Sequence, residues 1–232
     1  MTRRRSRKGL IITIDGPAGT GKSTAARLLA GRLGYLYLDT GAMYRAVGWR
    51  ALQEGLPLND PGRLNQLARR CRITFRKGRA GGVRVFLNGR EVTRQIRQPR
   101  VAEAASHVAA LRGVRRALVR QQKLIGAGGG VVAEGRDTGT VVFPQADLKV
   151  YLTASAAERA RRRHAELRRA GVGIPLREVA RQVRERDRRD LGRKASPLRP
   201  ASGCVRIDNT RLKSTDVLAR ILHYVRGARK GA

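Results

Sequence analysis

Residues 16–23 have the sequence Gly-Pro-Ala-Gly-Thr-Gly-Lys-Ser, and they decide how the rest of the chain is interpreted. The apolar run 10–14 precedes them, and residues 24–30 follow with the spacing of a helix. A strand, a glycine-rich loop and a helix in this order bind phosphate when the loop has the pattern GxxxxGK[ST]. Glycines let successive backbone N–H groups approach an anion, and the start of the helix adds its own unpaired N–H groups.

Lys22 and Ser23 end this loop and carry its expected chemistry. A lysine at this position reaches the terminal phosphates of a nucleotide, and the hydroxyl that follows it is offered to Mg²⁺. The alternative is a chance glycine turn before an ordinary helix. Because the strand, the loop and the helix all occur in the required order, the sequence predicts a nucleotide-phosphate site.

The length and composition favour one domain, or one domain with inserted lobes. Of the 232 residues, 41% are hydrophobic but only 4% are aromatic, so aliphatic side chains are expected to fill the core. The net charge is +34, from 51 Lys+Arg against 17 Asp+Glu. Such a charge favours polyanionic partners, but it is spread along every predicted helix. We therefore expect mostly solvated helix faces and only nonspecific contact with nucleic acid.

The sequence favours a cytoplasmic protein. No run approaches ~18 consecutive apolar residues, so no membrane-spanning helix is expected. The basic residues 1–8 lead into a short strand, without the apolar region and cleavage site of a secretory signal. Cys71 and Cys204 lack the spacing of a metal site, and we expect reduced, buried structural thiols.

Short apolar runs alternate with helical patterns along most of the chain. The expected strands are residues 10–14, 35–39, 131–133, 148–152 and 204–208. The expected helices are residues 21–33, 41–54, 61–70, 100–110, 114–126, 155–170, 176–190 and 215–226. Thr40 is expected at the N-cap of the second helix. This alternation predicts an α/β fold with a parallel sheet core flanked by helices on both faces.

Residues 72–92 interrupt that alternation. The segments 72–76 and 83–87 alternate apolar and polar residues, and Asn88-Gly89 favours a tight turn into residues 90–92. An antiparallel meander of this kind has no place in a parallel sheet. We therefore interpret it as an inserted lobe.

Charged and hydroxyl residues recur where the predicted strands end, which is the edge where such sheets bind their ligands. They come from the phosphate loop, residues 39–45, residues 134–137 and two arginine-rich helices after Leu152. There are more arginines than one triphosphate needs, so two phosphorylated ligands are expected to meet here. No Ser–His–Asp set, acid/base carboxylate pair or reactive thiol is evident. An acceptor phosphate needs no strong base, because its second pKa is about 6, and these features fit a nucleoside monophosphate kinase.

Five segments in the right order give the chain a close resemblance to the bacterial cytidylate kinase family over almost its whole length. They are ITIDGPAGTGKST (12–24), LDTGAMYR (38–45), VAEAASHVAALRGVRRAL (101–118), AEGRDTGTVVFPQADLK (133–149) and RERDRRD (184–190). The resemblance implies a P-loop core made of residues 9–60, 127–154 and 200–232. It also implies a small, β-containing monophosphate-binding lobe at about 61–126 and a short helical lid at about 155–194. No role follows for the basic tail 1–8.

The resemblance further implies transfer of the γ-phosphoryl group of ATP to CMP or dCMP, with Mg²⁺ accompanying ATP; we expect a monomer. The implied ATP-binding residues are Gly16, Pro17, Ala18, Gly19, Thr20, Gly21, Lys22, Ser23 and Thr24. The implied CMP-binding residues are Thr40, Arg45, Ser106, Arg115, Arg136, Asp137, Arg186, Asp190 and Arg193. The residues assigned to catalysis are Lys22, Arg136, Arg159 and Arg163. Ser23 is the metal-binding residue, and Glu134 is left out of the metal site.

Within the implied CMP pocket, Arg45 and Arg136 are assigned to the acceptor phosphate, where bidentate arginine suits the geometry. The residues assigned to the ribose are Ser106, Arg186 and Asp190. The residues assigned to the cytosine are Thr40, Arg115, Asp137 and Arg193. The cytosine amino group donates a hydrogen bond, so a carboxylate such as Asp137 should accept it. Uracil would place an oxygen there and should be rejected.

Two alternatives stay open. One is another P-loop kinase, acting on UMP or AMP. The other is a P-loop ATPase or RNA-binding module that uses the basic surface, although few aromatic residues are available for an RNA platform.

In the lid, Arg159 and Arg163 lie on one helix face and are assigned to ATP. The arginines expected on solvated faces are Arg161, Arg168, Arg169 and Arg177.

Overall fold

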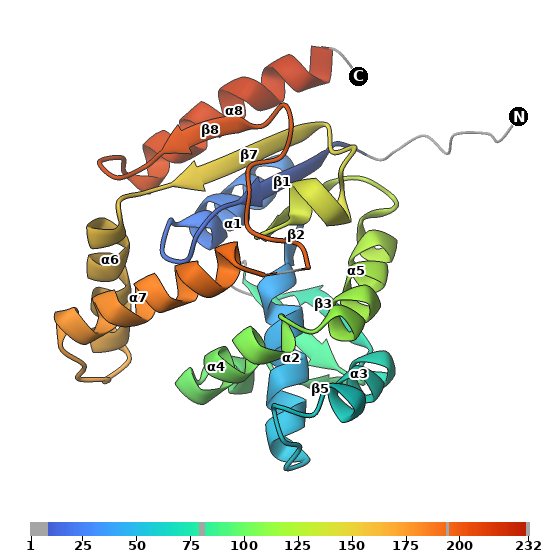
Figure 1. The fold of residues 1–232 in the computed structure, drawn as a ribbon. Helices are drawn as coiled ribbons and strands as arrows, with labels where there is room; N and C mark the ends of the chain where they lie inside the picture. The colour runs from blue at the N-terminus through green and yellow to red at the C-terminus, as the bar shows by residue number, and fades with distance from the viewer. Residues whose placement is uncertain (1–8, 79–81, 194, 231–232) are drawn as a thin grey trace, which may run out of the picture.

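A five-stranded parallel sheet forms the centre of the molecule (Figure 1). The computed structural model describes residues 9–78, 82–193 and 195–230. The strands of the sheet are β1 (Ile11–Asp15), β2 (Leu36–Asp39), β6 (Val131–Gly135), β7 (Leu148–Thr153) and β8 (Val205–Asp208), in the order β2-β6-β1-β7-β8. The predicted α/β class is therefore confirmed, whereas the predicted basic tail 1–8 lies outside the described residues.

Helices follow the strands in the predicted alternation. They are α1 (Lys22–Leu33), α2 (Thr40–Gln53), α3 (Pro61–Arg70), α4 (Pro99–Val108), α5 (Arg112–Gly126), α6 (Ala156–Arg169), α7 (Leu176–Leu191) and α8 (Ser214–Lys230). A 3₁₀ turn, η1 (Gln95–Arg97), and a π-helical turn, η2 (Thr138–Val142), complete the order. No helix in the described part of the chain is both long and apolar enough to cross a membrane.

The two faces of the sheet bury different apolar clusters. Ile12 and Ile14 of β1 and Leu152 of β7 are fully buried in the cluster that also contains α1 and α8. Because side chains alternate along a strand, Ile11 faces the opposite side. That side packs against α2 and α5 in a second, larger cluster. Aliphatic residues dominate both clusters, as the low aromatic content predicts.

The predicted meander forms a separate three-stranded antiparallel sheet of β3 (Ile73–Lys77), β4 (Val83–Leu87) and β5 (Arg90–Glu91). Its turn has Asn88 at φ 48° and Gly89 at φ 84°, the two positive values that a type I′ hairpin requires. Ile73, Val85 and Leu87 are buried in the same cluster as α2. The meander therefore packs on the core around α2, and the boundaries of the lobe and the lid stay predictions.

Three local expectations need correction or addition. Thr40 is the first residue of α2, and Asp39 is the N-cap, since its Oδ1 accepts from the Ala42 N–H at 2.8 Å. Cys71 is buried, as expected, but Cys204 is only half-buried. The π-helical turn η2 has no counterpart among the predicted elements. By contrast, Ser155 caps α6 as its position suggests, accepting from the Glu158 N–H.

Candidate functional site

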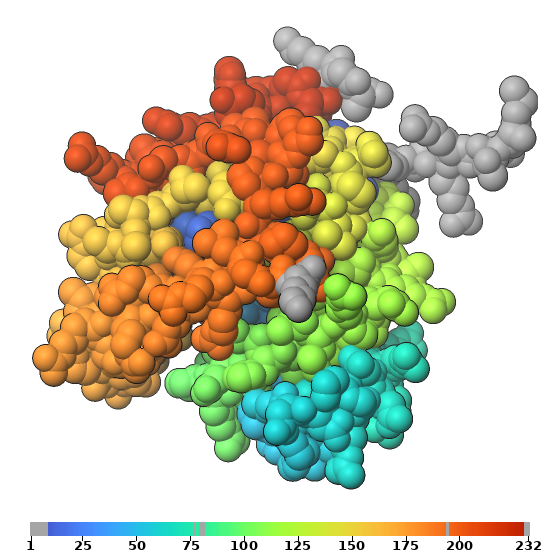
Figure 2. Space-filling model, in the orientation of Figure 1, coloured from blue at the N-terminus to red at the C-terminus, as the bar shows by residue number. Residues whose placement is uncertain are grey.

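The carboxyl ends of β1, β2 and β6 bring acidic and loop residues to one edge of the sheet. In register, Asp39 of β2 lies beside Glu134 of β6, and Asp15 of β1 lies beside Gly135. Figure 2 shows the blue N-terminal segment at the bottom of a recess, with the yellow and orange residues around it. The gathering of polar segments at this edge is therefore confirmed.

The phosphate loop is packed so closely that it tolerates only glycine at two positions. Gly16 has φ 149°, and a Cβ there would lie 2.0 Å from the Leu152 carbonyl oxygen at the end of β7. Gly19 has φ 77°, and a Cβ there would lie 3.0 Å from the backbone and Cβ of Arg159 in α6. The loop is thus held between the sheet and the lid helix.

Lys22 is buried and points back into the loop. Its Nζ donates to the Pro17 carbonyl at 2.6 Å and to Thr20 Oγ1 at 3.3 Å. Burial lowers the pKa of Lys22 below its usual range, and the positive charge of Arg136 lowers it further. An ammonium group in this position lacks hydration, and an anion between Lys22 and Arg136 would favour its charged form.

Ser23 hydrogen-bonds to a carboxylate that the sequence analysis left out of the metal site. Ser23 Oγ donates to Glu134 Oε1 at 2.6 Å, and Tyr37 donates to the same oxygen at 3.1 Å. Burial raises the pKa of Glu134, and the neighbouring charge of Asp39 raises it further. A hydroxyl and a carboxylate side by side are oxygen donors of the kind that Mg²⁺ takes, and a cation would offset the cost of burying the carboxylate. The donor set therefore fits Mg²⁺.

Asp190 joins two of the predicted CMP-binding arginines. Its Oδ2 accepts from Arg136 Nε at 2.7 Å, and its Oδ1 pairs with Arg193. Burial alone would raise the pKa of Asp190, but Arg136 and Arg193 outweigh it and hold the pKa below its usual value. One carboxylate of α7 thus fixes two guanidinium groups, one just after α7 and one just after β6.

The side chain of Arg186 has several other positively charged side chains around it. It makes no hydrogen bond to any residue in the described part of the chain. The loss of water around it lowers its pKa to about 10, with further lowering from Arg136. Arg45 and Arg163 also lower this pKa, whereas Asp190 raises it. Arg45 itself pairs with Asp39 at 2.7 Å. The excess of positive charge around Arg186 favours a bound anion.

The two lid arginines assigned to ATP differ in this structure. Arg159 is buried, donates to the Ala18 carbonyl at 3.2 Å and pairs with Asp187 of α7 at 2.7 Å. Arg163 is more exposed and pairs with Glu166 at 3.1 Å, while its positive charge helps to lower the pKa of Arg186. The four arginines expected on solvated faces are exposed: Arg161, Arg168, Arg169 and Arg177.

Two of the four residues predicted to bind cytosine form a buried ion pair. Arg115 and Asp137 make an ion pair, with side chains only 4% and 7% exposed. The Arg115 guanidinium also lies over the Tyr44 ring, 5.4 Å from its centroid. Thr40 Oγ1 donates to the Glu134 carbonyl at 2.7 Å, which leaves only its lone pairs for a ligand. Ser106 is half-buried on α4 and makes no hydrogen bond within the described chain.

Asp15 and Asn209 hold the site together, although the sequence analysis did not name them. Asp15 accepts from the Thr138 N–H at 2.9 Å and the Gly139 N–H at 2.7 Å, so it fixes η2 directly after Asp137. Asn209 Nδ2 donates to the Thr20 carbonyl of the phosphate loop. Their signal in the sequence is their position at or just after the carboxyl end of a strand, and Asp15 also lies in the segment 12–24 that carries the family resemblance.

The burial of Asp15 predicts a pH-dependent stability. Burial raises the pKa of Asp15 from 3.8 to about 6 despite its hydrogen bonds. The folded state therefore binds the proton more tightly, so this contribution to stability is full below pH 3.8 and is lost as pH rises through about 6. Urea unfolding between pH 4 and 7 should show a loss of about 2–3 kcal/mol from this group.

Asp15→Asn provides the comparison, because asparagine does not titrate. The free energy of unfolding of the variant is expected to lack this part of its pH dependence. The altered hydrogen bonds shift that free energy by the same amount at every pH and so do not affect the comparison. Equal slopes for the two proteins would show that Asp15 titrates as it does in the unfolded chain.

The chain is similar to known proteins over most of its length. The family model described as Cytidylate kinase matches residues 12–227. A cytidylate kinase from Pelotomaculum thermopropionicum is 47% identical over 94% of this chain and 97% of its own length. A bifunctional pantoate ligase/cytidylate kinase from a Synechococcus strain is 50% identical over 93% of this chain. The chain spans only 40% of the length of that bifunctional relative.

Solved structures support the fold. A gluconokinase from Sinorhizobium meliloti has a TM-score of 0.51 over 97% of this chain and 96% of its own. An uncharacterized protein from Eubacterium ventriosum has the same TM-score over 95% of this chain and 99% of its own. Their sequence identities are 17% and 11%, so these similarities concern the fold alone.

Proposed function

Because the chain belongs to the cytidylate kinase family, we propose that it transfers the γ-phosphoryl group of ATP to the 5′-phosphate of CMP or dCMP. The products are ADP and CDP or dCDP. The proposal includes Mg²⁺ as the ion that accompanies ATP, a monomeric cytoplasmic enzyme, and only nonspecific contact with nucleic acid.

One observation carries the proposal: the guanidinium groups of Arg136 and Arg186 lie close enough to the buried Lys22 to lower its pKa. Transfer between two phosphates needs positive charge at this point, since both reactants are anions. The three histidines lie on α4, α6 and α8, and none hydrogen-bonds to a residue in the described chain. The arrangement therefore supports catalysis by positioning and charge neutralisation.

On the donor side, the backbone N–H groups of the phosphate loop and Lys22 hold the phosphates of ATP. When bound with ATP, Mg²⁺ supplies positive charge at the β- and γ-phosphates, and Ser23 and Glu134 are the residues that would hold it. Arg159 ties the loop to α6 and α7 through Ala18 and Asp187. Closure of the lid over this side excludes water, which would otherwise hydrolyse ATP.

On the acceptor side, Arg45 and Arg136 hold the phosphate of CMP. This phosphate is largely ionised at neutral pH and attacks without losing a proton to the protein. The surroundings of Arg186 support a role at the phosphates in addition to the ribose contact first assigned to it. Asp137 accepts from the cytosine amino group, and Arg115 donates to the ring acceptors.

An acceptor panel tests the proposal. CMP, dCMP, UMP and AMP are offered separately with ATP and Mg²⁺, and ADP formation is measured over a range of acceptor concentrations. We expect kcat/KM for CMP and dCMP to exceed that for UMP and AMP. A preference for UMP or AMP would replace the assignment with another monophosphate kinase, and ADP release without an acceptor would indicate an ATPase.

Arg186→Met tests the unpaired cation. We expect KM for CMP to rise at least tenfold, because a charged hydrogen bond to an anion contributes about 1.5–3 kcal/mol. The thermal midpoint of the ligand-free protein should not fall, since the change removes a cation that Arg136 repels. Arg184→Met is the matched control, because Arg184 is an exposed arginine on the same helix. A normal KM in Arg186→Met would remove Arg186 from the acceptor site.

A further inference from the structure

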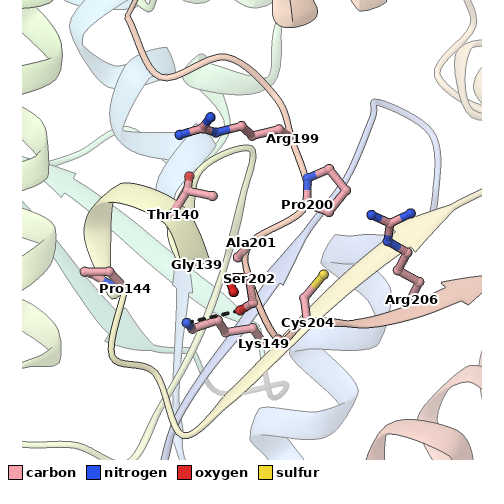
Figure 3. A pocket seen from close by; sticks show the side chains of 11 residues that line it. Gly139, Thr140, Pro144, Lys149, Arg199, Pro200, Ala201, Ser202, Cys204 and Arg206 are labelled. Carbon is pink, nitrogen blue, oxygen red and sulfur yellow. Dashed lines mark hydrogen bonds between the residues drawn. The ribbon is translucent and has the colours of Figure 1, made fainter.

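A pocket of about 650 Å³ lies on the side of β7 and β8 that faces away from α1 and α8. Val150, Leu152 and Ile207 point to the side covered by α1 and α8. Lys149 and Arg206 alternate with them and therefore point the other way. Residues 199–204 and η2 border this second side, and the pocket lies between them and the two strands (Figure 3).

The lining of the pocket is cationic. Lys149 comes from β7, Arg206 from β8 and Arg199 from the segment between α7 and β8, so three separate segments contribute positive charge (Figure 3). No aspartate or glutamate lines the pocket. Lys149 Nζ donates to the Ser202 carbonyl at 3.5 Å, and none of the three cations has an acidic partner in the described part of the chain.

Several arginines of the lid helices, by contrast, have acidic partners. On the lid helices, Arg161, Arg162 and Arg181 pair with glutamates three or four residues away. The pocket is also concave, and its volume lies within the range of about 300–1,000 Å³ that small-molecule sites occupy. Three cations around a hollow without a carboxylate give a site for an anion with several charged oxygens.

We propose that this pocket binds a small phosphorylated anion, such as pyrophosphate or the phosphate chain of a free nucleotide, at a second site separate from the transfer site. None of its lining residues belongs to the phosphate loop or to the CMP site. The turn η2 connects the two sites. Its residues Gly139 and Thr140 line the pocket, and the turn begins directly after Asp137 of the proposed CMP site.

Cys204 supplies a local reporter, because it is half-buried and lines the pocket. The test measures the alkylation rate of Cys204 by iodoacetamide, followed by peptide mass spectrometry, while pyrophosphate is titrated. Pyrophosphate is expected to slow the alkylation of Cys204. Cys71 is buried and reports on unfolding, so its slow alkylation should stay unchanged.

Arg199→Ala/Arg206→Ala removes two cations whose exposed side chains make no hydrogen bond or ion pair in the described chain. The pyrophosphate concentration that gives half-protection should rise about tenfold in this variant. Arg220→Ala/Arg226→Ala removes the same charge from exposed positions on α8 and should leave that concentration unchanged. Lys22→Met should also leave it unchanged, because the transfer site is elsewhere.

Three outcomes would overturn the proposal. The first is no protection by pyrophosphate. The second is an equal loss of protection in the α8 control, which would assign the effect to the overall charge. The third is protection by a single-stranded RNA but not by pyrophosphate, which would make the pocket part of a nucleic-acid surface. A CTP titration distinguishes a nucleotide from a bare phosphate chain, since a lower half-protection concentration for CTP identifies the nucleotide as the ligand.

Discussion

Replacing Lys22 by methionine is expected to lower kcat by about 10³-fold, because one preorganised donor at a reacting group contributes a factor of 10²–10³. The ammonium of Lys22 lies inside the phosphate loop, where burial and Arg136 already disfavour its charge. An anionic nucleotide relieves that cost, and it relieves it most when negative charge grows on the transferred group. The loss should therefore appear in kcat more than in KM for ATP.

The same substitution should leave the fold intact. Methionine has nearly the length of lysine and removes a buried charge, and the Pro17 carbonyl, which loses Lys22 as a donor, still accepts from Thr20 Oγ1 at 3.0 Å. We expect a thermal midpoint within about 4 °C of the original protein, since 1 kcal/mol shifts a protein of this size by 2–4 °C. Lys123→Met, at an exposed position on α5, is the matched control and should change neither quantity. Normal turnover in Lys22→Met would contradict the assignment of the loop.

The sequence predicts the core of this fold because its signals are local. The glycine pattern, the apolar runs and the Asn88-Gly89 turn each specify a conformation within a few residues. The order of the strands in the sheet was not predicted. It depends on which strands pair across long stretches of chain, as β1 does with both β6 and β7.

The site residues show the same limit. Lys22, Arg136 and Asp137 stand in recognisable motifs, whereas Asp15 and Asn209 act by contacts 123 and 189 residues away along the chain. Such contacts exist only once the sheet register is set. Glu134 is outside the metal site that the sequence predicts, and its hydrogen bond with Ser23 depends on β6 lying beside β1 and β2.

Asp137→Asn should change the choice of acceptor. In the proposed site the carboxylate accepts from the amino group of cytosine, whereas an asparagine amide can also donate to the oxygen that uracil has there. We expect the ratio of kcat/KM for CMP to that for UMP to fall by about 10²-fold, with KM for ATP nearly unchanged. The measurement is the same acceptor panel, carried out with the variant.

Stability must be separated from recognition in this variant. Arg115 is buried against Asp137, so loss of the negative charge leaves it unpaired and costs about 3–5 kcal/mol. A second variant, Arg115→Met/Asp137→Asn, also removes the unpaired guanidinium of Arg115. It should recover most of the lost free energy of unfolding, as measured by urea unfolding. It should not recover the preference for CMP, because both of the groups proposed to contact the base are then changed.

The ratio of the two kcat/KM values makes the test independent of folding. Both substrates meet the same population of folded enzyme, so a loss of active protein lowers both values equally and leaves the ratio unchanged. A ratio equal to that of the original protein would mean that Asp137 only holds Arg115 in place. A fallen ratio with an unchanged KM for ATP means that this carboxylate distinguishes the bases.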